Sequence, residues 1–279
     1  MRRKPIVALI YDFDGTLSPG NMQEFGFIQA IHKTPAEFWS MSDGIAIGQD
    51  ASNILSYMKL MFDEAHKAGI PLRKSDFKRF GQDIMLYEGV LGWFKNVNEY
   101  GRERGVRIEH YINSSGLKEI IEGSPLAKEF KHIFACSFIY NDKGEAEWPG
   151  VAVDYTAKTQ FLFKINKGIF SARDSLKVNE SMADENKRIP FTQMIYFGDG
   201  DTDVPSMKII NMFGGHTIAV YDPRKPERRD IARKLQRQGR ASFIAPANYS
   251  KDSRTFKLVC AIIDKIAADK ALSYFTNYR

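Results

Sequence analysis

The stretch Ile6-Val7-Ala8-Leu9-Ile10-Tyr11-Asp12-Phe13-Asp14-Gly15-Thr16 decides the fold of this chain. Its first six residues form an unbroken apolar run with β-branched side chains, which is typical of a strand buried on both faces of a parallel sheet. Residues i and i+2 of an extended chain share a side, so we expect Asp12 and Asp14 to project together and Phe13 to turn into the core.

Two carboxylates held this close repel each other by about 4 kcal/mol, at a separation of about 4 Å and an effective dielectric of ~20. A cation, a shared proton or a basic neighbour must offset that repulsion. An Asp-x-Asp pair at a strand end also occurs as a simple helix cap. The pair alone therefore leaves a catalytic and a capping interpretation open.

The rest of the chain alternates between strand-like and helix-like patterns. Strands are expected at residues 106–112, 132–140, 194–197 and 217–221, and a weaker one at 243–244. Helices are expected at residues 90–104, 117–130, 156–165 and 205–211, and from about 253 to the C-terminus. This alternation predicts an α/β fold with an open, mostly parallel sheet and helices on both faces.

A helical block interrupts the alternation directly after the first strand. Between residues 20 and 88, apolar side chains recur at spacings of three and four, and Pro35, Gly48, Gly69 and Pro71 divide the block into several helices. We interpret residues 20–88 as an inserted second unit, and residues 1–19 and 89–279 as the α/β unit. The polar residues 168–190 show little periodicity and predict an irregular excursion.

The composition is that of a globular protein long enough to need no disulfide bonds or metal sites for its stability. The 279 residues are 43% hydrophobic and 27% charged, enough for about two compact units of ~150 residues. Cys136 and Cys260 form no CxxC pair, which excludes a disulfide framework or a zinc cage. The basic start Met1-Arg2-Arg3-Lys4 resembles a signal peptide, but the apolar run that follows is too short. No stretch approaches the ~18 apolar residues of a membrane span, so we expect a cytoplasmic protein.

The net charge of +6 is concentrated in one segment. Residues 223–240 hold eight basic side chains against Glu227 and Asp230, and the rest of the chain is balanced. Such runs are usually solvated helix faces, and a site for nucleic acid or another anion is the alternative.

A second acidic turn follows the strand expected at residues 194–197, in the sequence Gly198-Asp199-Gly200-Asp201-Thr202-Asp203. Asp199, Asp201 and Asp203 match the first ligand positions of an EF-hand, but Val204 and Ile210 stand where that loop needs glycine and glutamate. Ligands of open α/β sheets bind beyond the carboxyl ends of the strands. Carboxylates gathered there favour a hard divalent cation, and we expect magnesium.

Two further features point to an anion at the same edge of the sheet. Ser114 and Ser115 follow the strand expected at 106–112, where a helix is expected to begin, and hydroxyl and backbone N–H groups there can hold an anion. Ser114 alone also fits a simple N-cap. Lys158, near the start of another helix, can add a positive charge, or it can be a solvated surface lysine.

Together these motifs resemble the haloacid dehalogenase superfamily of phosphatases and phosphotransferases, most closely its phosphoserine-phosphatase-like branch. Asp12-Phe13-Asp14-Gly15-Thr16 matches its DxDGT motif, Ser114-Ser115-Gly116-Leu117 its serine motif, Lys158 its lysine, and residues 198–203 its GDGxxD motif. The motifs occur in the family's order across residues 6 to about 207. The lysine is the weakest match, and Lys164 or Lys167 can replace Lys158.

The resemblance implies a Rossmann-like α/β/α core, an inserted helical cap and a phosphatase reaction on a small phosphorylated metabolite. Asp12 would be the nucleophile that forms an aspartyl-phosphate, and Asp14 the general acid and base. Ser114, Ser115 and Lys158 would hold the phosphoryl oxygens. Magnesium would be bound by the carboxylate of Asp12, the backbone carbonyl of Asp14, Asp199 and Asp203.

Three points depart from this pattern or stay open. Phosphoserine phosphatases carry a glutamate nine residues after the nucleophile, where this chain has Asn21; Glu24 lies one turn later. In the cap, the candidates for specificity are Glu24, Trp39, Tyr57, Arg73 and Arg79. A phosphotransferase or mutase is the alternative enzyme, and an anion- or nucleic-acid-binding protein using residues 223–240 the alternative from another class. We expect no nucleic-acid or membrane partner.

Overall fold

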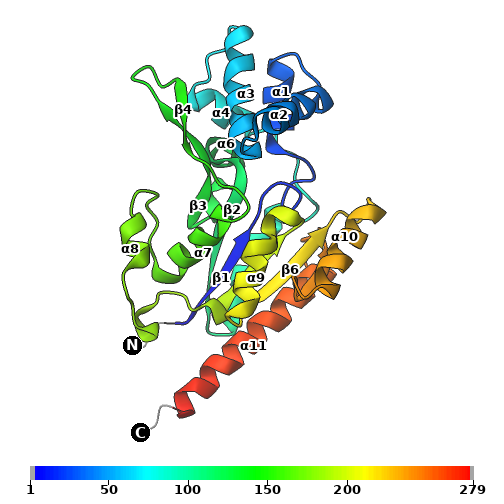
Figure 1. Ribbon diagram of the computed structural model, residues 1–279. Helices are drawn as coiled ribbons and strands as arrows, with labels where there is room; N and C mark the ends of the chain where they lie inside the picture. Colours follow the sequence, from blue (N-terminus) through cyan, green and yellow to red (C-terminus); the bar gives the residue numbers. More distant parts are fainter. Residues whose placement is uncertain (1–3, 277–279) are drawn as a thin grey trace.

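The structure is a computed structural model, and it describes residues 4–276. Its centre is a seven-stranded sheet with the strand order β4-β3-β2-β1-β5-β6-β7 (Figure 1). All neighbouring strands are parallel except β3 and β4. The strands are β1 (Ile6–Tyr11), β2 (Arg107–Leu117), β3 (His132–Tyr140), β4 (Ala146–Val151), β5 (Met194–Gly198), β6 (His216–Tyr221) and β7 (Phe243–Pro246).

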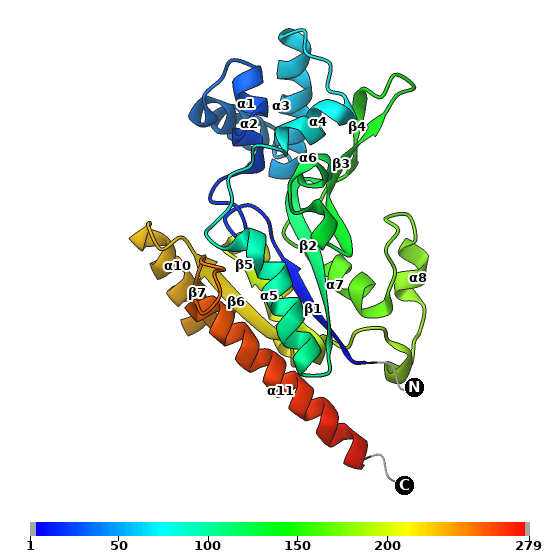
Figure 2. The same cartoon turned by 180° about the vertical axis from the view of Figure 1, so that it is seen from behind.

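Helices cover both faces of the sheet, which makes the three-layer α/β/α arrangement expected from the sequence. One face carries α7 (Ala157–Lys167), α9 (Val204–Met212) and α10 (Pro226–Arg237), and the other carries α5 (Val90–Glu103) and α11 (Arg254–Thr276) (Figures 1 and 2). Within residues 4–276, no helix is both long and apolar enough to cross a bilayer. The two cysteines are free and buried.

The first strand is buried as its apolar run predicts. Every residue from Val7 to Tyr11 is fully buried, and the Tyr11 hydroxyl accepts a hydrogen bond from the Trp93 indole at 2.8 Å. In the parallel register, Tyr11 lies opposite Ile112 of β2 and Phe197 of β5. The residues that follow these three strands therefore meet at one edge of the sheet. Arg2 and Arg3 of the basic start lie outside the described residues.

The block between β1 and α5 is helical, as expected, and lies beyond the carboxyl ends of the central strands (Figures 1 and 2). Helix α2 (Pro35–Gln49) begins with a capping box, in which the side chains of Thr34 and Glu37 each accept a hydrogen bond from the backbone N–H of the other residue. The elements are η1 (Met22–Glu24), α1 (Phe27–Ala30), α2 (Pro35–Gln49), α3 (Asn53–Lys67) and α4 (Lys74–Phe80).

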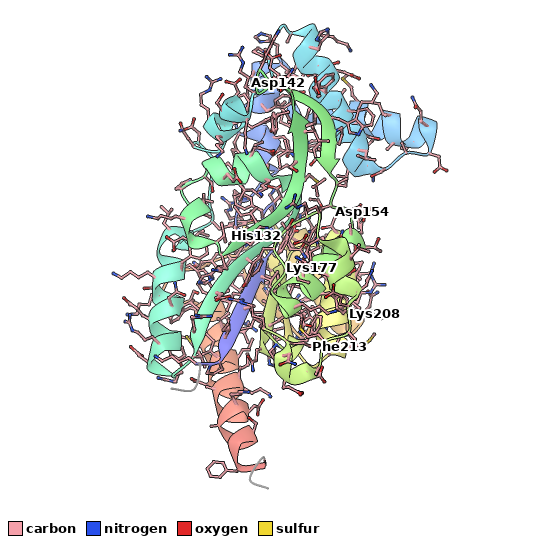
Figure 3. All side chains as sticks on the ribbon, turned by 90° about the vertical axis from the view of Figure 1, so that its left-hand side faces the viewer. His132, Asp142, Asp154, Lys177, Lys208 and Phe213 are labelled. Carbon is pink, nitrogen blue, oxygen red and sulfur yellow. The ribbon has the colours of Figure 1, made fainter. Side chains whose placement is uncertain are left out.

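A β-hairpin that the sequence pattern did not indicate joins this helical block. Strands β3 and β4 pair antiparallel, and Figure 3 shows Asp142 at the tip of the hairpin and Asp154 where the chain returns toward the sheet. The backbone N–H of Ala146 donates to the carbonyl of Leu72 at 2.8 Å. Strand β4 contains Pro149 and Gly150, and its register shifts twice, so no two-residue alternation marks it.

Two expected boundaries were wrong. Strand β2 continues through Ser114 to Leu117, so Ser114 caps no helix, and α6 (Lys118–Gly123) begins only after it. The helix expected at residues 117–130 is instead α6 and a single turn, η2 (Ala127–Glu129), because Pro125 disfavours helical geometry in the residue before it. The excursion at 168–190 contains short pieces, α8 (Ser175–Asn179) and η3 (Asp184–Asn186).

Helices α4 and α6 touch through their backbones. A Cβ added to Gly81 would lie 2.0 Å from the carbonyl oxygen of Ile120, and one added to Gly123 would lie 1.9 Å from that of Lys78. Neither position has room for a side chain. The helical block is therefore anchored directly to the helix that follows the Ser114 motif.

Candidate active site

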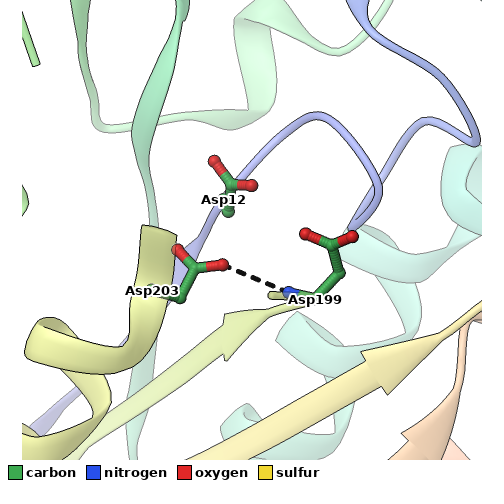
Figure 4. Close-up of side chains that lie close together, drawn as sticks. All are labelled: Asp12, Asp199 and Asp203. Atoms are coloured by element: carbon green, nitrogen blue, oxygen red, sulfur yellow. Dashed lines mark hydrogen bonds between the residues drawn. The ribbon is translucent and has the colours of Figure 1, made fainter. Parts of the chain in front are cut away.

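Three aspartates from two strand ends form a compact acidic cluster. Asp12 follows β1, Asp199 follows β5, and Asp203 lies in the turn before α9 (Figure 4). One carboxylate oxygen of each lies within 4.8 Å of one from each of the others. The parallel register brings these strand ends together, as expected from the sequence.

Lys158 is the cation inside this cluster. Its side chain is fully buried, and its Nζ donates to Asp12 Oδ1 at 3.0 Å and to Asp203 Oδ1 at 2.8 Å. Asn113, at the carboxyl end of β2, donates from Nδ2 to the Lys158 carbonyl at 2.9 Å and so ties α7 to that strand. The carboxylates on both sides hold the pKa of Lys158 above its usual value despite its burial.

The two other candidate lysines lie elsewhere. Lys164 donates to the carbonyls of Ser171 and Ala172, and Lys167 donates to the carbonyls of Val178 and Glu180. Both therefore hold the irregular excursion after α7. Of the three, Lys158 alone reaches the aspartates.

Asp203 is held by hydrogen bonds on both oxygens. Tyr196 donates from its hydroxyl to Oδ1 at 2.7 Å, and the backbone N–H of Asp199 donates to Oδ2 at 3.2 Å (Figure 4). A Cβ on Gly198 would lie 2.3 Å from the Asp203 carboxyl carbon, so this glycine is what lets the carboxylate fold back against the strand end. Asp203 thus fixes Lys158 and the acidic turn in place.

The other two carboxylates of the cluster, Asp12 and Asp199, share the positive charge of Lys158 with Asp203. Burial raises the pKa of Asp12 to about 6, against the opposing effect of Lys158, and it raises the pKa of Asp199 to about 7. Arg228 approaches Asp199 only to 3.6 Å. Oxygen ligands with this uncompensated charge fit a hard divalent cation such as magnesium.

Gly15 makes the approach of the two motifs possible. Its φ is 74°, and a Cβ there would lie 2.2 Å from Asp199 Oδ2. The side chain of any other residue would clash with the Asp199 carboxylate. The glycine of the first motif therefore has a steric role in bringing the acidic turns together.

Asp14 points into the same cleft as Asp12, while Phe13 is fully buried, as the i, i+2 argument predicts. The backbone N–H of Met22 donates to Asp14 Oδ1 at 2.9 Å, which orients the carboxyl group. Burial, with a smaller contribution from the charge of Asp12, raises the pKa of Asp14 well above its usual value. This carboxyl group therefore keeps its proton more readily than an exposed aspartate does.

The two serines face the cleft from the irregular end of β2. Ser114 Oγ accepts from the backbone N–H of Gly116 at 3.0 Å. Ser115 Oγ is buried and has no hydrogen-bond partner among the described residues, and the Ser115 carbonyl accepts from the Tyr57 hydroxyl at 2.7 Å. An unpaired buried hydroxyl on a residue that lines the cleft is available to an oxygen-rich ligand.

A cleft of about 510 Å³ joins these groups to the helical block. Three of the residues suggested for specificity line it, namely Glu24, Trp39 and Tyr57. Glu24 Oε1 accepts from Trp39 Nε1 at 2.9 Å and from Asn21 Nδ2 at 2.7 Å. Arg73 and Arg79 do not line it: Arg73 pairs with Glu145 at the hairpin, and Arg79 with Asp76.

The sequence pattern did not indicate four residues that support or line the site. Tyr196 and Asn113 act through hydrogen bonds to Asp203 and Lys158 that only the folded chain shows. Lys225 and Arg228 line the cleft opposite the helical block. The basic run at 223–240 was the available signal for these two, but it did not show which of its members face the site.

Comparisons with known proteins agree with this architecture. Residues 9–208 match the family model of the haloacid dehalogenase-like hydrolases, so the chain belongs to that family. An uncharacterized protein of Borreliella burgdorferi is 29% identical over 290 residues, which is 92% of this chain and 96% of the relative.

Solved structures of phosphatases share the fold. A phospho-aspartyl intermediate analogue of phosphoserine phosphatase has a TM-score of 0.54 and 18% identity, and the match covers 86% of this chain and 93% of that one. A probable phosphoserine phosphatase from Vibrio cholerae has a TM-score of 0.57 and 12% identity, covering 96% of this chain and 67% of that one.

Proposed function

We propose that this protein is a magnesium-dependent phosphatase that hydrolyses a small phosphorylated metabolite through an aspartyl-phosphate on Asp12. The observation that carries the proposal is the position of Asp12, which pairs with the buried cation of Lys158 and shares an acidic cluster with Asp199 and Asp203. Membership of the haloacid dehalogenase-like hydrolases and the phosphatase fold support it.

In the proposed reaction, Asp12 attacks the phosphorus atom. Lys158 binds Asp12 Oδ1, which leaves the other carboxylate oxygen to form the new P–O bond as the bond to the leaving oxygen breaks. Asp14 gives its proton to that leaving oxygen. In the second half, water attacks the phosphoryl group, Asp14 takes the water proton, Asp12 leaves as a carboxylate, and phosphate is released.

The remaining groups hold the charge that builds up on the phosphoryl oxygens. Lys158 supplies a fixed positive charge, and the Ser115 hydroxyl is a free donor at the end of β2. Ser114 is placed beside it. Asp12, Asp199 and the Asp14 backbone carbonyl would hold magnesium, with Asp203 positioning them; when bound, the ion supplies positive charge to the acidic cluster and to the phosphate.

The helical block is proposed as a cap, residues 20–88 over a core of 1–19 and 89–279. Its Glu24, Trp39 and Tyr57 line the far side of the cleft from Asp12, where the leaving group would lie. Asn21 stands where phosphoserine phosphatases carry glutamate, and here it donates to Glu24. The family's preference for serine phosphate therefore does not transfer directly to this chain.

The direct test is phosphate release from p-nitrophenyl phosphate by the purified protein. We expect turnover with magnesium, loss of it with excess EDTA, and recovery when magnesium is added back, because the cluster has more negative charge than Lys158 neutralises. Turnover that persists in EDTA would contradict the metal assignment. Adding a competing alcohol tests the phosphotransferase alternative, since an acceptor other than water yields a phosphorylated alcohol in place of free phosphate.

Asp199→Asn should raise the magnesium concentration needed for half-maximal turnover by roughly tenfold or more, because the variant loses a charged ligand at the site. The Michaelis constant at saturating magnesium should change much less. Asp201→Asn is the matched control, since Asp201 lies in the same turn but outside the cluster. A magnesium titration that is identical for Asp199→Asn and the wild type would count against Asp199 as a ligand.

A further inference from the structure

Two basic side chains at the start of α10 face the catalytic cleft. Lys225 precedes the first residue of the helix, and Arg228 follows one turn later. Both line the same cleft as Asp12 and Lys158. Figures 1 and 2 show this end of α10 at the edge of the sheet that faces the helical block.

Lys225 and Arg228 are cations of the cleft that have no role in the proposed reaction. The cleft is lined mainly by acidic and neutral side chains, and its third cation, Lys158, is buried between Asp12 and Asp203. Among the described residues, Lys225 has no carboxylate within ion-pair distance, and Arg228 has only Asp199, at 3.6 Å.

The neighbouring arginines of the basic segment are engaged in other contacts. Arg224 donates from Nε and Nη2 to Asp222, Arg229 lies over the Tyr221 ring, and Arg233 pairs with Asp230. The segment therefore does not present one continuous basic surface. Two of its basic side chains, Lys225 and Arg228, line a cleft of about 510 Å³, which is the size of a small molecule and not of a nucleic acid.

We propose that Lys225 and Arg228 form a second anion subsite, so that the preferred substrate carries a phosphate or carboxylate in addition to the phosphoryl group at Asp12. This inference rests on the proposed phosphatase function. Arg228 Nη1 lies 3.6 Å from Asp199 Oδ2, and Asp199 belongs to the cluster that contains Asp12. The second anion would therefore lie in the same cleft as the phosphoryl group at Asp12, on the side of Asp199.

The geometry also gives Arg228 freedom to serve a ligand. About half of its side chain is exposed (47%), and its contact with Asp199 is longer than a close charge-assisted hydrogen bond. A guanidinium in this position can turn toward a bound carboxylate or phosphate and bind it through two N–H groups. Lys225, on the same face one turn earlier, would add a second, less directional charge.

The test compares substrates that differ only in the second anion. Glycerol 3-phosphate against 3-phosphoglycerate tests a carboxylate, and fructose 1-phosphate against fructose 1,6-bisphosphate tests a second phosphate. We expect the wild type to have the higher kcat/KM for the doubly anionic member of at least one pair. Arg228→Gln should reduce that preference by roughly tenfold or more, and Lys225→Met by a smaller factor. The pair that shows the preference identifies the anion.

Controls separate this role from an effect through Asp199. Arg237→Gln removes an arginine from the far end of the same helix, outside the cleft, and should leave the preference unchanged. If Arg228→Gln acted only by disturbing Asp199, it would shift the magnesium titration and lower kcat/KM equally for both substrates of a pair. That outcome, or no preference in the wild type, would overturn the subsite.

The outcomes also separate the subsite from the proposed function. If p-nitrophenyl phosphate is hydrolysed but the pairs show no preference, the phosphatase function stands and the subsite fails. If nothing is hydrolysed, equilibrium binding of fructose 1,6-bisphosphate by calorimetry still measures the subsite. Binding weakened by Arg228→Gln and not by Arg237→Gln would then support the subsite without the reaction. Equal binding by the wild type and the two variants, together with no hydrolysis, would reject both the subsite and the phosphatase function.

Discussion

Asp12→Asn is expected to abolish phosphate release, lowering kcat by at least about 10⁴-fold, because an amide cannot act as the nucleophile that forms the covalent intermediate. The substitution keeps the shape of the side chain, so the cleft should stay intact. Folding should survive, since Lys158 still has Asp203 as a partner at 2.8 Å. We expect a melting temperature within a few degrees of the wild type.

The same variant tests the covalent step separately from turnover. Rapid acid quench of the wild type with substrate should trap a phosphorylated protein whose mass is raised by one phosphoryl group, and Asp12→Asn should show none. Asp142→Asn, at the exposed hairpin tip (Figure 3), is the control and should keep full turnover. Turnover by Asp12→Asn close to that of the wild type would remove Asp12 as the nucleophile.

Lys158→Met is the second variant with a large expected effect, and it should lower both activity and stability. Removing one partner of a buried ion pair typically costs about 3–5 kcal/mol, because the remaining charge is left uncompensated. Here two carboxylates, Asp12 and Asp203, would be left facing each other without the intervening cation. Phosphate release should also disappear, since the fixed charge on the phosphoryl oxygens is lost. Chemical denaturation and the p-nitrophenyl phosphate assay measure the two effects.

A matched variant and a double mutant separate these effects. Lys164→Met also removes a buried lysine of α7, but its Nζ binds only carbonyls of the excursion, so activity should be kept. The double mutant Asp12→Asn/Lys158→Met should lose less stability than the sum of the two single changes. It removes the charge of Asp12, which Lys158→Met alone would leave uncompensated. Additive losses, or activity lost in Lys164→Met and kept in Lys158→Met, would contradict the assignment.

The central sheet was predictable because its strands are short, apolar and separated by helical periods. The apolar run at residues 6–11 forms strand β1 with the expected boundaries. Strand β4 was missed because Pro149 and Gly150 erase the alternation that marks a strand, and its pairing with β3 forms only in the tertiary structure. The end of β2 was misplaced because Ser114-Ser115-Gly116 has no strand signal of its own.

The acidic and lysine residues of the site were predictable because each motif follows a strand, and parallel strands end at one edge. The supporting contacts were not. That Tyr196 holds Asp203 depends on a hydrogen bond across a turn, which no spacing rule gives. Charge counting found the basic segment, but the direction of Lys225 and Arg228 follows from how α10 docks on β6 and β7. That Lys158 and not Lys164 reaches the aspartates likewise depends on the folded structure.

The backbone contact between Gly81 and Gly123 has a consequence for how substrate enters. Because α4 and α6 have no side chains between them at this crossing, the helical block has a fixed side and cannot rotate away there without breaking the contact. Any widening that admits substrate must then occur at the opposite rim, between α2 and the start of α10. That rim is where Lys225 and Arg228 lie, so an arriving anion would meet these two residues at the entrance, ahead of the acidic cluster.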